Sequence, residues 1–260
     1  MLKIAFLFLT ITNIVHENYW RDFFRNHDDQ YSILVHAKEQ VSPKSWFKQF
    51  EMPYKVENSW ARTMRTQIAL LKEALKDPYN EMFIFCSQNC IPLQSFDFIY
   101  EELISSRMST FRYEQNPHAD PKRSCYEAHR DFRPIPLEQQ YKNSQWIILN
   151  REHAQMMVDD QKIIDFISRY PHDQEHYPSI FLGLHNRLHE VHKCEKTMVV
   201  WHLDARPPHI FRDLSIDEDR NLLIEAITYG LFFVRKIDEQ CDLSPIDHLL
   251  DYRSSSPAAR

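Results

Sequence analysis

The chain has 260 residues, with 31 Lys and Arg against 37 Asp and Glu, which gives a formal net charge of −6. This balance argues against a general nucleic-acid-binding protein, because such proteins contact phosphates through a basic surface. The length and the absence of an interrupting linker predict a single domain over residues 1–252, with a disordered tail over 253–260.

Strand-like and helix-like segments alternate along the chain. We predict strands at Lys3–Thr10, Tyr31–His36, Glu81–Cys86, Ser144–Leu149 and Thr197–His202, and helices at Ile14–Phe24, Ala61–Leu75, Ser95–Ile104, Arg151–Asp160, Ser179–His192 and Ile216–Phe233. Helix-length connections between successive strands predict an α/β fold with a mostly parallel central sheet and helices on both faces.

The first strand also bears on targeting. The apolar run of MLKIAFLFLTIT covers only Ile4 to Leu9, and no small-residue cleavage site follows it, so we expect a buried strand and not a signal peptide. No stretch elsewhere approaches the roughly 20 apolar residues that a membrane-spanning helix needs. Together with five scattered cysteines, these features predict a soluble cytoplasmic protein with reduced thiols.

Polar residues follow two of the predicted strands, where parallel sheets usually bind ligands. His36 ends the second strand, and Ser87, Gln88 and Asn89 end the third, so we expect them to face one crevice. The segment FIFCSQNC carries no carboxylate, although Mg²⁺ or Mn²⁺ would need carboxylate oxygens there. With only two glycines, Gly183 and Gly230, the chain also lacks a glycine-rich phosphate loop.

Two other segments attract attention for different reasons. From Arg107 to Gln140 the apolar periodicity fades and Pro, Arg, Tyr and His accumulate, which predicts a substrate-facing loop. The segment PHDQEHYP packs ionisable side chains between Pro171 and Pro178. Its His172, Glu175 and His176 match HxxEH, a pattern of some zinc peptidases, and His185, His189 and His192 follow at helical spacing. The two prolines oppose the zinc interpretation, because that motif requires a continuous helix.

Glu175 has two further interpretations. It is either a general base just before a helix N-terminus, with Asp173 and His176 as neighbours that orient it, or simply a cap of that helix. Towards the carboxyl end, Lys236 ends a strongly apolar run, GLFFVRKI, which we predict to be helical. It is either a helix-end cation favoured by the dipole or a cation that neutralises a diphosphate.

Several blocks occur in a characteristic order: FIFCSQNCIPLQSFDFIY, KNSQWIILNREHA, DQEHYPSIFL, VVWHLDARPPHIF and LFFVRK. In this order they resemble the core-2/I-branching glycosyltransferase family, particularly its plant-type branch, over residues 3–240. The resemblance implies a variant GT-A fold and a metal-independent, inverting transfer of a sugar, GlcNAc or xylose, from a UDP-sugar to an acceptor hydroxyl. No cofactor is implied.

The resemblance also implies roles for individual residues. Glu175 is the general base, and Arg212 and Lys236 replace the metal beside the UDP diphosphate, with Arg206 and Arg235 as substitutes. The remaining donor-side residues are Thr10, His36, Ser87 and Gln88, and the acceptor-side residues are Ser144, Gln145, Trp146 and Trp201. Two alternatives stay open at this point: a zinc-dependent hydrolase built on HxxEH, and a non-catalytic carbohydrate-binding protein of the same fold.

Overall fold

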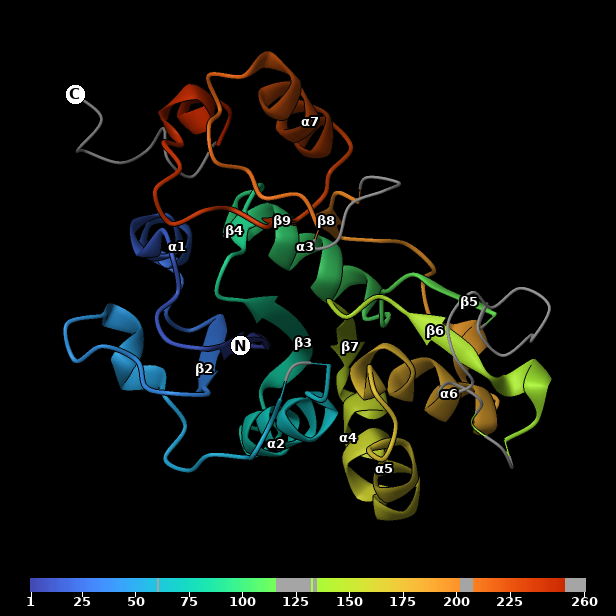
Figure 1. The fold of residues 1–260 in the computed structure, drawn as a ribbon. Helices are drawn as coiled ribbons and strands as arrows, with labels where there is room; N and C mark the ends of the chain where they lie inside the picture. The colour runs from blue at the N-terminus through green and yellow to red at the C-terminus, as the bar shows by residue number, and fades with distance from the viewer. Residues whose placement is uncertain (60, 116–131, 133–134, 202–207, 251–260) are drawn as a thin grey trace.

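The structure is a computed structural model that describes residues 1–59, 61–115, 132, 135–201 and 208–250, shown in Figure 1. The strands are β1 (Lys3–Thr10), β2 (Tyr31–Ala37), β3 (Asn80–Ser87), β4 (Ile91–Pro92), β5 (Tyr113–Gln115), β6 (Tyr141–Asn143), β7 (Ile148–Asn150), β8 (Thr197–Val199) and β9 (Phe233–Arg235). The α-helices are α1 (Glu17–Phe24), α2 (Met64–Ala74), α3 (Phe96–Ser106), α4 (Arg151–Asp159), α5 (Gln161–Ile167), α6 (Tyr177–Leu184) and α7 (Asp217–Thr228). Short 3₁₀ helices lie at Trp46–Phe50, Leu137–Gln139, Asp173–Glu175, Leu188–Glu190 and Ser244–Leu249.

The central sheet has the strand order β2-β1-β3-β7. Strands β1, β2 and β3 are parallel, and β7 joins the edge in the antiparallel direction. Parallel strands covered on both sides need continuous apolar runs, and β1 and β3 supply them. Because these strands run the same way, their carboxyl ends, Thr10, Ala37 and Ser87, meet at one edge of the sheet.

Helices cover both faces of this sheet (Figure 1). Alternate residues of β1 separate accordingly, because side chains along a strand point to opposite faces. Phe6 and Phe8 enter one hydrophobic core with α1, α3 and α7, whereas Ala5 and Leu7 enter a second core with α2, α4, α5 and α6. The predicted α/β fold, with a mostly parallel sheet and helices on both faces, is confirmed.

A second, smaller sheet combines β4 with two strands from the C-terminal part of the chain. Its order is β4-β9-β8, with β9 antiparallel to β4 and parallel to β8. The prediction that GLFFVRKI is helical is therefore wrong, and Lys236 directly follows a strand. A separate pair, β5 with β6, is antiparallel. Strand β5 lies within the region predicted as a substrate-facing loop, and β6 directly follows that region.

The C-terminal helix is shorter than the sequence predicts. Helix α7 ends at Thr228, five residues before Phe233, the predicted end of the helix. Gly230 adopts a φ of 68°, and the amides of Gly230 and Leu231 donate to the carbonyls of Ile227 and Ala226. This is a Schellman motif. It favours glycine, because glycine has no Cβ and adopts the left-handed conformation without a steric penalty.

Helix α6 ends in the same way, at a different residue. Asn186 has a φ of 55°, and the Arg187 amide donates to the Leu182 carbonyl, so the predicted helix Ser179–His192 ends at Leu184. His185 follows that helix, whereas His189 belongs to the 3₁₀ helix Leu188–Glu190. The three histidines therefore do not share one helix face.

Three further observations concern expectations from the sequence. The predicted strand Ser144–Leu149 is displaced, because β7 begins only at Ile148 and the chain bends at Gln145 and Trp146. Arg206 and the tail 253–260 lie outside the described residues. Among the described residues, no helix combines the length and the apolar character that crossing a membrane requires.

Candidate active site

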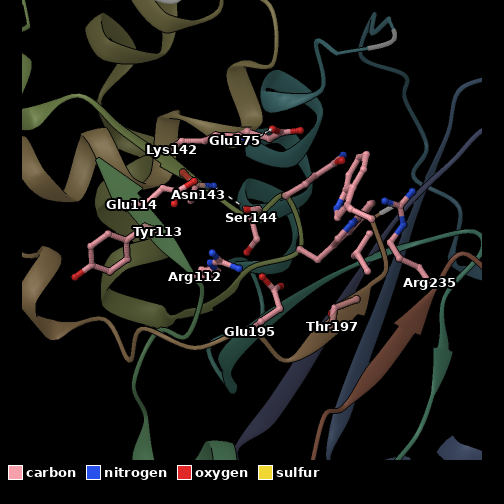
Figure 2. Close-up of a pocket in the computed structure, with 14 residues that line it drawn as sticks. Arg112, Tyr113, Glu114, Lys142, Asn143, Ser144, Glu175, Glu195, Thr197 and Arg235 are labelled. Atoms are coloured by element: carbon pink, nitrogen blue, oxygen red, sulfur yellow. Dashed lines mark hydrogen bonds and ion pairs between the residues drawn. The ribbon is translucent and has the colours of Figure 1, made fainter. Parts of the chain in front are cut away.

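A cavity of about 320 Å³ is lined by residues of β5, β6, β8 and β9 and of the segments next to them (Figure 2). Its volume falls at the lower end of the roughly 300–1,000 Å³ that small-molecule sites occupy. The lining residues are Arg112, Tyr113, Glu114, Lys142, Asn143, Ser144, Gln145, Trp146, Glu175, Glu195, Thr197, Val199, Trp201 and Arg235. Residues distant in sequence therefore meet at one site, and most of them are polar or aromatic.

The cavity gathers several residues that the sequence singled out. Those on the acceptor side and the predicted base all line it: Ser144, Gln145, Trp146, Trp201 and Glu175. Trp146 is 6% exposed and forms a wall, whereas Trp201 is 60% exposed at the surface. The two indoles thus offer one buried and one open aromatic surface to a ligand.

Glu175 is positioned by the residues on either side of it. It ends the 3₁₀ helix Asp173–Glu175, and the buried Asp173 fastens this turn to the start of α2. Asp173 Oδ1 accepts hydrogen bonds from the amides of Thr63 and Met64 at 3.1 Å and of Gln174 at 2.8 Å. These bonds tie the loop that carries Glu175 to a helix that packs on the central sheet.

Asn143 supports the same turn from β6. Its Nδ2 donates to the Gln174 carbonyl at 3.2 Å, and its Oδ1 accepts from the Ser179 hydroxyl at 2.8 Å. His176 adds a contact, because its Nδ1 lies 2.8 Å from the Tyr141 carbonyl and must therefore donate. The strand that lines the cavity and the turn that bears Glu175 are consequently held as one unit.

The electrostatics favour an ionised Glu175. Burial on its own would raise the pKa of this carboxyl, but the neighbouring His172 and the charges of Lys142 and His176 lower it below its ordinary value. Lys142 Nζ lies 3.6 Å from Oε2, and His172 Nδ1 lies 3.7 Å from Oε1. A carboxylate of this kind accepts a proton at neutral pH without first losing one.

Arg235 brings a cation to the opposite wall. Its guanidinium carbon lies 4.5 Å from the centre of the Trp146 ring, a cation–π distance. Burial lowers its pKa, while the charges of Cys90 and Glu175 act in the other direction. Within the described residues its Nε is buried without a hydrogen-bond partner. The sequence named this residue only as a substitute for Lys236.

Several lining residues were missed by the sequence analysis. Lys142 and Asn143 directly precede Ser144, so the block KNSQWIILN contained the signal. Arg112 belongs to the predicted substrate-facing loop and was not singled out. Glu195 carries no motif at all, yet burial raises its pKa to about 7, against the lowering influence of Ser144 and Arg112. Only the folded chain identifies it.

The predicted donor-side residues lie at the carboxyl edge of the central sheet, outside the lining of this cavity. His36 is buried and its Nε2 accepts from the Val56 amide at 2.9 Å, while burial lowers its pKa. Gln88 Oε1 accepts from the Ile11 amide at 2.6 Å. The hydroxyl of Thr10 donates to the Thr12 carbonyl, and that of Ser87 contacts Cys90 Sγ at 3.1 Å. These side chains therefore hydrogen-bond to the loops that follow the strands and stabilise this edge of the sheet.

Arg212 and Lys236 come from neighbouring segments. The Phe211 amide donates to the Lys236 carbonyl at 2.9 Å, which sets the two chain stretches side by side. The Arg212 side chain is 67% exposed, and its Nε lies 3.8 Å from Asp238 Oδ2. Burial, followed by the charge of Arg235, lowers the pKa of Lys236. Neither of the two lines the cavity that contains Glu175.

The HxxEH segment has the wrong geometry for the zinc interpretation. His172 adopts a left-handed conformation before a 3₁₀ turn, whereas His176 is buried with its ring 4.8 Å from that of Phe132. Over the ranges that the structure describes, no group of His, Cys, Asp and Glu side chains is arranged to hold a metal ion. The zinc-hydrolase alternative therefore has no support from these residues.

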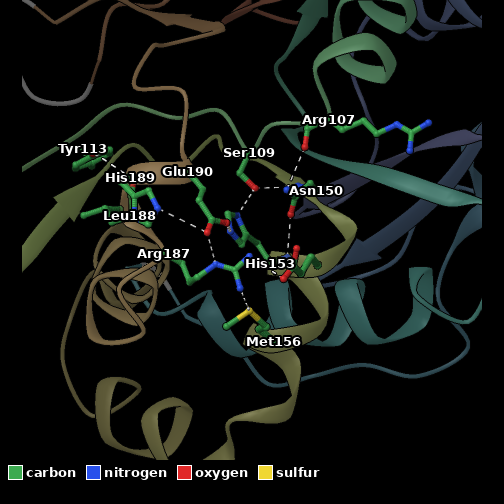
Figure 3. A network of polar contacts seen from close by, with 11 residues as sticks. Arg107, Ser109, Tyr113, Asn150, His153, Met156, Arg187, Leu188, His189 and Glu190 are labelled. Carbon is green, nitrogen blue, oxygen red and sulfur yellow. Dashed lines mark hydrogen bonds and ion pairs between the residues drawn. The ribbon is translucent and has the colours of Figure 1, made fainter.

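A second polar cluster lies away from the cavity (Figure 3). The Ser109 hydroxyl is 2.7 Å from His153 Nδ1, and His153 Nε2 is 3.1 Å from Glu190 Oε2. The order of groups is that of a serine-hydrolase triad, but Ser109 and His153 are both 0% exposed. No substrate reaches them, and the cluster instead joins α4 to the chain before β5 and to the 3₁₀ helix Leu188–Glu190.

Comparison with known proteins identifies the family. The sequence profile described as "Branch: Core-2/I-Branching enzyme" matches residues 4–223 of the 260 residues. The chain belongs to the core-2/I-branching enzyme family. The predicted resemblance is thereby confirmed, and membership of this family supports a sugar-transfer function.

Core-2/I-branching relatives include a curated plant protein. The glycosyltransferase BC10 of Oryza sativa subsp. japonica is 32% identical over 172 residues, which cover 62% of this chain and 42% of the rice protein. The match thus spans less than half the length of that relative. It agrees with the plant-type branch to which the core-2/I-branching motifs of this chain are similar.

Solved structures similar to this core-2/I-branching chain are more distant. The galactosyltransferase LgtC, determined with donor and acceptor sugar analogues, has a TM-score of 0.40 at 9% identity and covers 74% of this chain and 73% of its own. A197 from STIV has a TM-score of 0.28 at 12% identity and covers 58% of this chain and 67% of its own.

Proposed function

We propose that this protein is an inverting, metal-independent glycosyltransferase that moves GlcNAc or xylose from a UDP-sugar to an acceptor hydroxyl. The observation that carries the proposal is the carboxylate of Glu175, which Lys142 and His172 keep ionised within a cavity of aromatic and cationic side chains. Family membership supports the class of reaction. The donor, the sugar and the stereochemical course are the proposed parts.

The proposed step is a single displacement. The acceptor hydroxyl gives its proton to Glu175 while its oxygen attacks the anomeric carbon. The bond between that carbon and the diphosphate oxygen breaks, and UDP leaves with the electron pair. Attack on the face opposite to the leaving group inverts the anomeric centre.

The departing diphosphate needs positive charge close to it. Arg212 and Lys236 are the proposed cations, supported by the contact between their segments, and Arg235 is a third that faces the cavity itself. Thr10, His36, Ser87 and Gln88 remain the proposed donor-side residues at the sheet edge, and Ser144, Gln145, Trp146 and Trp201 the acceptor-side residues. No step in this scheme requires a divalent ion.

The deciding experiment measures UDP release from UDP-GlcNAc and UDP-xylose, with and without EDTA, over a panel of hydroxyl-bearing acceptors. Glu175→Gln should lower turnover by roughly 10²–10⁴-fold, the usual contribution of a general base, and leave UDP affinity unchanged. Glu225→Gln is the matched control, because Glu225 is an exposed glutamate on α7 that does not line the cavity. Turnover retained in Glu175→Gln would remove the base assignment.

The same assay separates the alternatives. Activity lost on chelation of metals would contradict metal independence and favour a metal-dependent enzyme. A wild-type protein that binds sugars but releases no UDP from any donor would be a non-catalytic carbohydrate-binding module.

A further inference from the structure

The cavity contains a second buried carboxyl, which the proposed displacement does not use. Glu195 lies on the segment that leads into β8, whereas Glu175 comes from the turn before α6. Figure 2 shows Ser144 between these two side chains, and all three line the same cavity. A carboxyl on each side of one small cavity can engage two different groups of a single ligand.

Two buried atoms of this second wall meet no hydrogen-bond partner at normal distance and angle in the part of the chain that the structure describes. Within the described residues, Glu195 Oε1 and Ser144 Oγ are buried and make no hydrogen bond of normal geometry, although Ser144 lies close enough to lower the pKa of Glu195. Leaving buried polar atoms unpaired costs free energy, so native proteins rarely keep them unpaired without a reason. A ligand that both donates and accepts hydrogen bonds would satisfy them together.

The charge around Glu195 restricts what that ligand is. Burial raises its pKa to about 7, so its carboxyl is present in both protonation states at neutral pH. The charged groups that line the cavity with it are Arg112, Glu114, Lys142, Glu175 and Arg235. A second carboxylate placed against Glu195 would add like charge to a group that burial already disfavours as an anion.

We propose that Glu195 and Ser144 form a subsite that holds a second hydroxyl of a neutral pyranose acceptor. The subsite orients the ring so that another hydroxyl faces Glu175, and Glu195 is therefore a positioning residue. Trp201, which is 60% exposed and lines the same cavity, provides the aromatic surface on which a pyranose ring lies. This inference rests on the proposed function, because it assigns the acceptor to the cavity of Glu175.

Binding of simple glycosides tests the subsite without requiring turnover. The probes are the methyl β-glycosides of glucose, galactose and xylose, with methyl β-glucuronide as the charged counterpart of the glucoside, titrated by NMR in the presence of UDP. We expect at least one neutral glycoside to bind, and to bind more tightly than the glucuronide. Failure of all three neutral glycosides to bind, or tighter binding of the glucuronide, would overturn the proposal.

Variants then locate the interaction. Glu195→Gln should weaken binding of the preferred glycoside by about tenfold, because a charge-assisted hydrogen bond is lost, and Ser144→Ala should weaken it severalfold. Glu225→Gln should leave it within about twofold, since Glu225 is exposed on α7 and does not line the cavity. Unchanged binding in both Glu195→Gln and Ser144→Ala would overturn the subsite.

The dependence of binding on pH distinguishes positioning from a merely structural role. Wild-type affinity for the glycoside should rise between about pH 6 and about pH 8, because the ionised carboxyl is the stronger acceptor, and Glu195→Gln should flatten this rise. A structural role would change the melting temperature and leave the pH dependence in place. Glycoside binding that depends on Glu195 without any sugar transfer would support the subsite and refute the proposed function, whereas transfer without that dependence would do the reverse.

Discussion

The guanidinium carbon of Arg235 lies 4.5 Å from the centre of the Trp146 ring, so a cation from the last strand stacks on an aromatic side chain that precedes β7. This contact closes one wall of the cavity that also contains Glu175. The guanidinium is held by stacking, and its Nε stays unpaired within the described residues. The arrangement leaves hydrogen-bonding capacity for an anionic ligand.

This geometry ranks the cations in their effect on UDP binding. Arg235→Ala should weaken UDP affinity by about tenfold or more, which corresponds to about 1.4 kcal/mol. Arg212→Ala should have a smaller effect that shrinks further at high salt, because the Arg212 side chain is 67% exposed and its charge is screened. Isothermal titration calorimetry at two ionic strengths measures both. If Arg212→Ala weakened UDP affinity more than Arg235→Ala, the diphosphate would bind beside Arg212 and not beside Arg235.

Lys142 should control the acid limit of activity. Glu175 acts as a base only when ionised, so turnover falls as the pH drops through its pKa. The charge of Lys142 helps to lower that pKa, and Lys142→Gln should therefore raise it and move the acid limb of the pH–rate profile to higher pH. Arg65→Gln, which removes an exposed cation paired with Asp165, is the control. Superimposable profiles for wild type and Lys142→Gln would contradict the assignment.

Asp173 should matter for stability through its acceptor oxygen and not through its charge. Burial raises its pKa to about 6, and three backbone amides donate to its Oδ1. Asp173→Ala leaves these amides without their acceptor, which should lower the free energy of unfolding on the order of 2–3 kcal/mol. Asp173→Asn keeps an oxygen in place and should cost distinctly less. Urea denaturation compares the two variants, and equal losses would show that the charge matters.

The stability of Asp173→Asn should also differ from wild type in its pH dependence. The raised folded pKa means that the folded state holds its proton more tightly than the unfolded state. Wild-type stability from this group is therefore fully present below the ordinary value of 3.8 and is lost as the pH rises through about 6. Asn does not titrate, so this component should disappear in the variant.

His153 predicts the opposite pH dependence. Burial lowers its pKa below the ordinary value of 6.5, although Glu190 acts to raise it. The unfolded state then binds the proton first, so the contribution to stability is present above about pH 6.5 and is lost as the pH falls through the lowered folded pKa. His153→Gln should reduce this loss between about pH 8 and about pH 5.5, measured by urea denaturation. His189→Gln, altered at a side chain that is 77% exposed, should leave it unchanged.

The fold could be predicted where local pattern and tertiary burial agree. The continuous apolar runs of β1 and β3 are typical of covered parallel strands, and Ser95 caps α3 as the sequence suggested, because its hydroxyl accepts from the Phe98 amide at 3.2 Å. The end of α7 was predicted too late, although Gly230, one of only two glycines in the chain, marks it. Apolarity alone does not separate a buried strand from a buried helix, which is why β9 was taken for a helix.

The candidate site was predictable to the extent that it lies in contiguous motifs. Ser144, Gln145 and Trp146 lie in one block of the sequence and line one wall of the cavity. Glu195 lies between Cys194 and Lys196 and belongs to no recognisable motif. Its pKa is raised by burial, which arises only when the chain folds. The direction of Arg235 likewise depends on β9 lying between β4 and β8.

The position of β9 has a consequence for how the protein is made. Its two sheet neighbours, β4 and β8, are both synthesised earlier and do not pair with each other. A nascent chain that has not yet reached Phe233 therefore exposes two unsatisfied strand edges, the kind of surface that pairs with other chains. Competence for ligand and protection from aggregation should arrive together, once Phe233–Arg235 has been synthesised and pairs with both neighbouring strands.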